Sequence, residues 1–499
     1  MDWHDVVDFQ RAAKNVYMDV EGDWYRDPWS WWEIQWLLET DDGKATITEH
    51  AERKRMFDVS LLDVPKERFG TRPAVVIHPI DRLLTQACVD RMSVKLIGDL
   101  HQAAHGWRLS STQPQQGAFE NNSEEYSRFR TALAELSAES EALLTTDVTG
   151  CFANIPVGRV CELLKQRYGG SAPSIYVEQV LLEFDQHPNR RGLPQRSLSS
   201  CVIANLYLSQ LDKLLVLEAG EHFARWMDDL YIFGARADEL RRIQVLVSDL
   251  LREMELEINL GKTELLEGDP MRERVNEVRA SGIGWALARD DNEEPLIERL
   301  SEEVVNRGED SERTAISHSC TLAIKYEVED AAELLFDVAP RLPHGADHVA
   351  RLFRYFQMGS DLQHWFVEMC SSGWSEQHWA LAQYISVFED VDSPDTELVG
   401  LLEGLLEKRS STRAQLAVGV AAARMLCRWY PKHAIDVVRS ALSRTEHPME
   451  IRALVLLGNE YSEERSRTRR WLKKHEDNVA TLKALEWRSF KVKAQLPVA

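Results

Sequence analysis

The spacing of hydrophobic positions divides the chain into regions of different secondary structure. Between about residues 70 and 270, short apolar runs such as PAVVIHP, ALLTTDV and LYIFG alternate with longer stretches of helical period such as DRLLTQACVDRMSVKLI. Short runs rich in β-branched and aromatic residues are typical of strands, and apolar residues every three to four positions are typical of helices. This alternation predicts an α+β domain with a sheet packed under helices.

After about residue 275 the strand-like runs stop, and apolar positions recur only at helical spacing. The breaks between segments carry helix-ending residues, as in PRLPHGAD, DVDSPD and YPKH. Such a string of helices is expected to stack in pairs, so residues 275–499 are predicted to form an all-α, HEAT-like helical repeat domain. The predicted segments are 314–326, 330–338, 346–357, 361–371, 375–388, 396–408, 411–429, 431–443, 447–460 and 479–489.

Residues 1–70 are a third predicted region, in which tryptophans cluster in DWYRDPWSWWEIQWLL. The large rings favour an aromatic core or a subunit contact. A surface that stacks on nucleobases is the alternative. Near the other end of the chain, the run RSRTRRWLKKH is strongly basic. A solvated helix face explains this run, and a segment that contacts phosphates or a partner is the alternative.

Composition limits the class of protein. Of the 499 residues, 44% are hydrophobic and 28% are charged, which is typical of a chain that folds throughout. The apolar runs look too short for a membrane helix, the N-terminus is acidic where a signal peptide would be basic, and the seven cysteines lack metal-ligand spacing. We therefore expect a cytoplasmic protein with reduced thiols and no membrane partner. The net charge of −22 argues against non-specific coating of duplex nucleic acid.

Two carboxylate sites stand in unusually apolar surroundings. Asp228 and Asp229 lie between two β-prone runs in HFARWMDDLYIFG, and Asp147 ends the apolar run of LLTTDVTGCF. Two adjacent carboxylates at the tip of a hydrophobic hairpin repel each other unless a cation lies between them. If the strand and the hairpin share a sheet edge, they can hold two Mg²⁺ ions for phosphoryl transfer. Buried capping or turn carboxylates are the alternative.

Four segments resemble, in order, the motifs of reverse transcriptases. DVTGCF resembles motif A, GLPQRSLSSCVIANLYL motif B, RWMDDLYIF the motif C hairpin and LEINLGKTELL motif D, while HPIDRLLTQACVDRM and HGWRL resemble the fingers blocks upstream. The resemblance covers about residues 65–270 and implies a reverse-transcriptase fingers-palm fold for residues 71–270. With its helical domain, the chain is similar to the abortive-infection, defence-associated reverse transcriptases of bacteria. That likeness implies DNA synthesis against phage, untemplated and tyrosine-primed in some members, often by a homo-oligomer.

The resemblance assigns roles to five residues of the chemical site. Asp147 and Asp228 match the two metal-holding carboxylates, and Asp229 matches the neighbouring, less direct ligand. The cofactor implied is a pair of Mg²⁺ ions. Lys262 matches the motif D lysine that can protonate pyrophosphate as a general acid. Phe152 matches the aromatic residue that closes against the sugar 2′ position and favours deoxynucleotides, with core packing as the alternative.

Further residues are candidates for binding substrate. Gln195 matches the motif B glutamine at the nucleotide and template face, and Arg196 follows it where templated enzymes generally have glycine. A side chain there fills space that a template strand would use, or binds a phosphate. Arg72 and Arg82 are candidates for holding the triphosphate, because guanidinium groups bind phosphate oxygens in a bidentate way. Structural ion pairs are the alternative for both.

These residues predict an anti-phage polymerase that makes DNA from dNTPs with Mg²⁺, without a conventional template and with the protein as primer. Primer candidates are Tyr17 and Tyr25 in the N-terminal region and Tyr126 in the polar stretch before motif A. The product would be single-stranded DNA attached to the protein, and the assembly a homo-oligomer, a trimer or a hexamer. The alternatives are a templated bacterial reverse transcriptase that uses a partner non-coding RNA, and a non-catalytic scaffold that senses phage.

Overall fold

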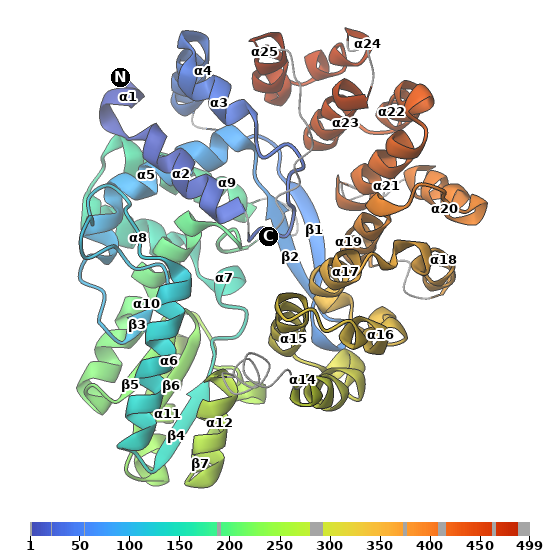
Figure 1. Cartoon of the computed structure of the whole chain (residues 1–499). Helices are drawn as coiled ribbons and strands as arrows, with labels where there is room; N and C mark the ends of the chain where they lie inside the picture. The colour runs from blue at the N-terminus through green and yellow to red at the C-terminus, as the bar shows by residue number, and fades with distance from the viewer. Residues whose placement is uncertain are drawn as a thin grey trace. The chain divides into compact units, whose positions relative to one another are not determined.

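A computed structural model describes residues 2–20, 22–53, 55–186, 191–279, 293–372, 377–407, 416–461 and 466–487 (Figure 1). The chain forms two compact units that alternate along the sequence. Unit 1 consists of Met1–Arg26, Ile34–Met56 and Pro79–Ala280, and unit 2 of Asp27–Glu33, Phe57–His78 and Ser281–Ala499. The three consecutive domains expected from the sequence therefore do not coincide with the compact units, because two short N-terminal segments belong to unit 2.

Unit 1 is built around a five-stranded sheet with the strand order β3-β5-β6-β4-β7. The strands are β3 (Ala104–His105), β4 (Ala142–Thr146), β5 (Phe223–Trp226), β6 (Asp229–Gly234) and β7 (Glu264–Glu267). Neighbouring strands are antiparallel except for β3 and β5, which run parallel. Every residue of β4 is buried, because the strand is paired on both sides and α11 packs against it. The predicted α+β architecture of this region is confirmed.

Helices cover the sheet and extend unit 1. Phe129 and Leu133 of α6 join Leu143, Phe233 and other residues in one buried hydrophobic cluster. Their spacing of four places both side chains on one helix face. The helices of this unit are α1 (Trp3–Val6), α2 (Phe9–Val20), α3 (Glu33–Glu39), α4 (Asp41–Arg53), α5 (Pro79–Ile97), α6 (Asn122–Ala138), α7 (Cys151–Asn154), α8 (Val157–Tyr168), α9 (Ala172–Gln186), α10 (Leu198–Ala219), α11 (Ala237–Glu253) and α12 (Asp269–Arg279).

Helix α10 is more apolar than the sequence analysis allowed. Among the described residues it is the one helix whose length and composition would suffice to cross a membrane, so the expectation that no run is long enough is wrong. Of its most apolar window, 67% is buried inside the protein. The core helix of a folded domain has this property, because it is surrounded by apolar neighbours on most sides.

In its described residues, unit 2 consists of helices and one β-hairpin. In the hairpin, β1 (Ser60–Pro65) pairs with β2 (Thr71–Val76) in antiparallel register, and β1 packs against α19. The helices are α14 (Glu294–Arg299), α15 (Arg313–Lys325), α16 (Asp330–Phe336), α17 (Ala346–Tyr355), α18 (Leu362–Ser371), α19 (His378–Ile385), α20 (Thr396–Glu407), α21 (Leu416–Trp429), α22 (Ala434–Leu442), α23 (Pro448–Tyr461), α24 (Ser466–Arg469) and α25 (Val479–Trp487).

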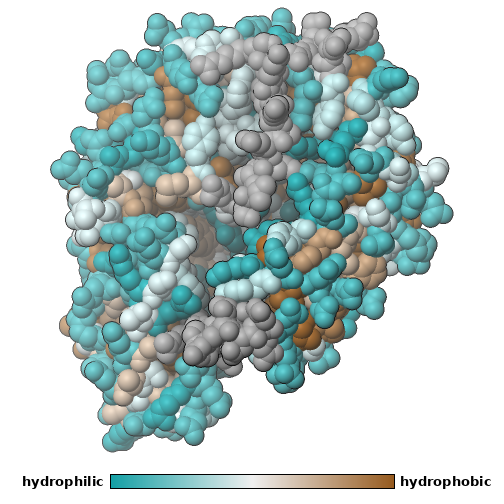
Figure 2. All heavy atoms as spheres, viewed as in Figure 1, coloured by the Kyte–Doolittle hydropathy of each residue, from teal (hydrophilic) through white to brown (hydrophobic). Residues whose placement is uncertain are grey.

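The helices of unit 2 stack in the manner of a helical repeat. Helices α15, α17, α19, α21 and α23 pack one upon the next, and α16, α18, α20 and α22 pack beside them (Figure 1). The prediction of a helical C-terminal region is confirmed. Parts of the predicted segments 375–388, 396–408, 411–429 and 479–489 fall outside the described residues. The face in view in Figure 2 is mostly hydrophilic, in keeping with a chain that carries 28% charged residues.

The N-terminal tryptophans pack in both units. Buried rings include Trp3, Trp24 and Trp36 in unit 1 and Trp29 and Trp31 in unit 2. For these five side chains the packing interpretation is confirmed, because a base-stacking surface would require exposed rings.

A buried arginine anchors the N-terminal segment of unit 2. Arg452 on α23 binds Glu33 through Nε at 2.6 Å and Nη2 at 2.8 Å, and it binds Asp27 through Nη1 at 2.7 Å. The Thr481 hydroxyl donates a further hydrogen bond to Glu33 at 2.6 Å. The Arg452 side chain is fully buried and faces the ring of Trp31 at 4.9 Å. A buried charge of this kind is tolerated only when its partners are in place.

Replacing Arg452 by alanine should strongly destabilise unit 2. The change leaves two carboxylates buried without their cation, which costs about 3–5 kcal/mol of unfolding free energy. Urea unfolding of the full chain measures this loss, with Arg428→Ala on the exposed side of α21 as the control. The control should change stability by less than about 0.5 kcal/mol. Equal effects of the two variants would show that the Arg452 cluster is not an anchor.

Candidate active site

The pairing of β4 and β6 brings three carboxylates to one edge of the sheet. Thr146, the last residue of β4, lies opposite Leu230 of β6, so Asp147 follows directly beside the start of β6. Trp226 pairs with Asp229, which leaves Met227 and Asp228 as the turn between β5 and β6. The strand register therefore determines that Asp147 meets the Asp228–Asp229 pair.

A buried arginine that the sequence analysis overlooked holds the hairpin turn. Arg225 of β5 is fully buried and binds both carboxylate oxygens of Asp212 on α10 at 2.6 Å. Its Nη1 also donates to the Met227 carbonyl at 2.7 Å and to Asn205 at 3.1 Å. Met227 has a φ of 53°, a left-handed conformation that non-glycine residues rarely adopt. A charged residue within the apolar strand FARW was the available sequence signal.

The electrostatics of the site favour a cation. Burial and then repulsion by Asp228 raise the pKa of Asp229 to about 7, although Asp229 is exposed at the surface of the protein. Burial and then the charge of Asp228 also raise the pKa of the Cys151 thiol well above its usual range. Lys262 Nζ lies 2.9 Å from Asp147 Oδ2 and supplies one positive charge. The cluster carries more negative than positive charge.

The carboxylates fit a divalent cation in their chemistry. Asp147 Oδ1 is buried and accepts no hydrogen bond from the described residues, so one ligand oxygen is available. A metal ion would also offset the burial and the repulsion by Asp228 that raise the pKa of Asp229. Within the described ranges no group of three or more His, Cys, Asp or Glu side chains is already arranged as a metal site.

Comparison with known proteins identifies the region that carries these residues. Residues 64–286, less than half of the chain, match the family model of reverse transcriptases, described as RNA-dependent DNA polymerases. This region is a reverse transcriptase domain. A solved structure of telomerase from Candida albicans, in complex with the TWJ fragment of telomeric RNA, matches over 90% of this chain and 70% of that chain. Its identity of 9% and TM-score of 0.30 carry no argument on function. None of the curated proteins searched matches the chain.

Within the reverse transcriptase domain, the motif B loop, residues 192–197, lies against α7. Leu193 N–H donates to the Phe152 carbonyl at 2.7 Å. Gly192 has a φ of 70°, and a Cβ atom there would overlap the backbone of Phe152 and Ala153. Phe152 and Gln195 are both half-buried. The structure thus brings the backbone of Phe152 and the loop with Gln195 together.

The predicted phosphate-binding arginines lie in three different settings. Arg196 is exposed and stacks on the ring of Trp24 at 4.2 Å. Arg82 is buried and forms ion pairs with Asp19 and Asp23. Arg72 lies on β2 of unit 2. The bound carboxylates of Arg82 match the structural ion-pair alternative, whereas a triphosphate role for these arginines stays a prediction.

The three primer candidates also differ in their surroundings. Tyr126 on α6 is 38% exposed, and its ring meets Trp226 of the motif C hairpin edge-on at 5.0 Å. Burial and then the charge of Asp229 raise the pKa of its hydroxyl, while Arg130 lowers it. Tyr17 on α2 is half-buried, and Tyr25 is buried. The ring of Tyr126 therefore packs against the β5–β6 hairpin.

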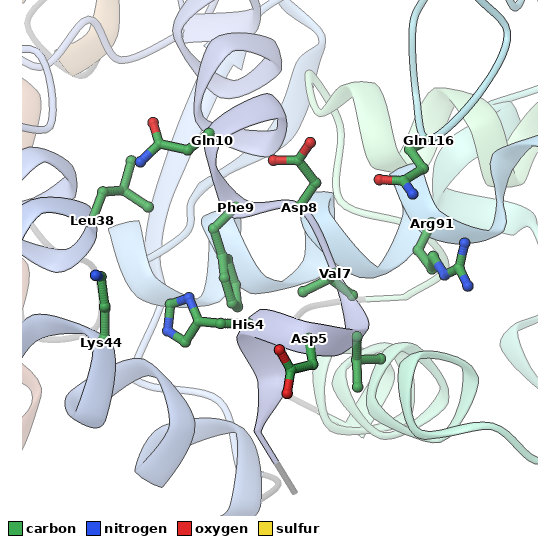
Figure 3. A pocket seen from close by; sticks show the side chains of 11 residues that line it. His4, Asp5, Val7, Asp8, Phe9, Gln10, Leu38, Lys44, Arg91 and Gln116 are labelled. Carbon is green, nitrogen blue, oxygen red and sulfur yellow. The ribbon is translucent and has the colours of Figure 1, made fainter. Parts of the chain in front are cut away.

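A cavity of about 500 Å³ lies elsewhere in unit 1 and contains none of the predicted site residues. Figure 3 shows its lining, where the ring of His4 lies beside Phe9 with a centroid distance of 4.8 Å. Its charged groups, Asp5, Asp8, Lys44 and Arg91, carry both signs. The cavity therefore presents no concentrated charge for a phosphate or a metal ion.

Replacing Asp229 by asparagine should stabilise the metal-free protein above neutral pH. A carboxyl pKa raised to about 7 means that the folded state retains a proton that the unfolded state loses near pH 4. Stability from this group therefore falls as pH rises from about 4 to about 7. In a chelator, the melting temperature of Asp229→Asn should exceed that of the wild type at pH 8 by more than at pH 5. The exposed Asp249→Asn is the control, and a pH-independent difference would contradict the assignment.

Proposed function

We propose that this protein is a Mg²⁺-dependent polymerase that joins dNTPs into single-stranded DNA without a conventional template, primed by the protein itself, in defence against phage. One observation carries the proposal: at the edge of the sheet, Asp147 lies next to the Asp228–Asp229 pair. The buried Oδ1 of Asp147 accepts no hydrogen bond from the described residues, and Oδ2 pairs with Lys262. Carboxylates crowded in this way suit two-metal phosphoryl transfer.

Asp147 and Asp228 would hold the metal ions, with Asp229 as their electrostatic support. The bound Mg²⁺ would polarise the triphosphate and lower the pKa of the attacking hydroxyl. The hydroxyl oxygen forms a bond to the α-phosphorus, its proton passes to water, and pyrophosphate departs with the electrons of the broken P–O bond. Lys262, whose ammonium lies 2.9 Å from Asp147, can donate a proton to the departing pyrophosphate.

Two side chains support the choice of substrate. Phe152 is half-buried and its backbone carbonyl contacts the motif B loop, so its ring would exclude a 2′-hydroxyl by its bulk and dNTPs are the proposed substrates. Arg196 replaces the glycine of templated enzymes and extends from this loop to Trp24. A bulky side chain there disfavours close approach of a template strand. A primer tethered to the protein compensates for weak binding of nucleic acid, because attachment raises its effective concentration.

The proposed setting is cytoplasmic defence by a homo-oligomer, a trimer or a hexamer. This part of the proposal rests on a resemblance: like the defence-associated reverse transcriptases of bacteria, the chain combines a reverse transcriptase domain with stacked helices. A templated enzyme that requires a partner RNA, and a scaffold without catalysis, are distinguished from the proposal by the experiment below.

The experiment is incubation of the purified protein with each labelled dNTP and Mg²⁺, without template, followed by denaturing gels with and without protease. We expect incorporation by the wild type, and for Asp228→Asn a loss of at least about a hundredfold, because two-metal chemistry requires the charge of both ligands. The Asp249→Asn variant, on the exposed side of α11, should retain full activity. Undiminished incorporation by Asp228→Asn would remove the polymerase proposal, and dependence on added RNA would favour the templated alternative.

Protein priming predicts a nucleotide adduct on a tyrosine, and the contact with Trp226 favours Tyr126. Tyr126→Phe keeps the ring packing but removes the hydroxyl, so it should abolish protein-attached product. Tyr17→Phe is the matched control and should retain it. Mass spectrometry of nuclease-trimmed protein identifies the adduct. An unchanged adduct in Tyr126→Phe would transfer the role to another tyrosine, whereas product that runs free without protease would exclude protein priming.

A further inference from the structure

The end of helix α2 caps the motif B helix. Ser197, at the N-cap of α10, supplies no side-chain hydrogen bond to the helix. Instead the Leu198 N–H donates to Asp19 Oδ2 of α2 at 2.9 Å. A carboxylate at a helix N-terminus satisfies an otherwise unpaired N–H group and interacts favourably with the helix dipole. A residue far away in sequence thus determines where α10 begins.

Arg82 joins the same segment to the motif B loop. Its guanidinium binds Asp19 at 2.8 Å, forms an ion pair with Asp23, and donates to the Arg196 carbonyl at 3.3 Å. The Arg82 side chain is only 7% exposed. Loss of any one partner would leave an unpaired charge buried in the protein. The end of α2 with the residues after it, helix α5 and the motif B loop are therefore held together.

Residues 22–25, which we call the strap, contact the loop directly. Trp24 is buried, and the Arg196 guanidinium stacks on its ring at 4.2 Å. Arg196 has a φ of 59°, a strained left-handed conformation for a non-glycine residue. A backbone of this kind persists only where the surroundings hold it, and Trp24 and Arg82 are among the partners of Arg196.

The motif B loop transmits this constraint to the nucleotide side. Leu193 donates to the Phe152 carbonyl at 2.7 Å, and Gly192 allows the backbones to approach. The thiol of Cys201, on α10, has its pKa raised by burial first, then by Asp19, and further by Asp228, while Arg196 lowers it. The start of α10 is therefore within electrostatic range of both the strap side and the catalytic hairpin.

We infer that the strap is a positioning element for nucleotide binding, in which Trp24 acts through Arg196 to hold the motif B loop against Phe152. The inference rests on the proposed function, since it concerns the nucleotide of that reaction. Asp19 and Asp23 are further positioning residues. Neither these two carboxylates nor Trp24 touches the reacting atoms.

The test uses the full-length protein with Trp24→Leu, which removes the aromatic face but keeps apolar volume, and Trp24→Phe, which keeps a ring. The control is Tyr168→Leu, which removes the stack of Lys95 on an aromatic ring at the end of α8. Hydrogen exchange of the Leu193 and Leu198 amides reports on the loop. Calorimetry with a non-hydrolysable dNTP analogue and Mg²⁺ reports on nucleotide binding without turnover.

For Trp24→Leu we expect exchange at both amides to be about tenfold faster and the nucleotide Kd to be about tenfold higher. Trp24→Phe should lie close to the wild type, and Tyr168→Leu should match it. Unchanged exchange, or faster exchange with an unchanged Kd, would overturn the inference. If the wild type binds the analogue but incorporates no dNTP, the proposed polymerase function is refuted. The inference about the strap is then still accepted or rejected on the amide exchange rates and the nucleotide Kd of the Trp24 variants. A wild type that binds no nucleotide would refute both.

Discussion

Buried arginine side chains hold the irregular backbone of this protein in place. Arg225 binds the turn of the β5–β6 hairpin, Arg82 binds the motif B loop, and Arg452 binds the N-terminal segment of unit 2. A guanidinium has five N–H donors in one plane, so a single side chain can bind carboxylates and carbonyls from several segments at once. Because each charge is buried, separating it from its partners is costly. Segments without regular hydrogen-bond ladders thereby keep a single conformation.

The aspartate cluster differs from these arginine sites, because groups of like charge lie close together in it. There, Lys262 pairs with Asp147, while burial and then repulsion by Asp228 raise the pKa of Asp229 to about 7. An arrangement that is electrostatically unfavourable in the bare protein would become favourable with the cations that the proposed function requires. The rest of unit 1 supplies the rigidity, because β4 is buried and paired on both sides while Arg225 holds the turn.

The path of the chain connects unit 1 with unit 2 more than once. The chain passes between the units after residues 26, 33, 56, 78 and 280. Only Arg26 separates the strap, which contacts the motif B loop, from the segment of residues 27–33 that Arg452 anchors. The two sets of buried ion pairs therefore lie in adjacent segments of the chain, although each set belongs to its own unit.

The sequence by itself determined the α+β class of the polymerase region, the helical character of the C-terminal region and the candidate aspartates. These are local properties, because the spacing of apolar residues, the aspartates that end strands and each single motif can be recognised within a short stretch of sequence. The sequence did not indicate that Arg225 holds the hairpin, that Arg82 joins Asp19 to the motif B loop, or that residues 27–33 and the β1–β2 hairpin belong to unit 2. Arg452 and Asp27 lie 425 positions apart, and no short window contains such a pair. Only tertiary structure decides these contacts, because buried charges take whichever partners the folded backbone brings within hydrogen-bond distance.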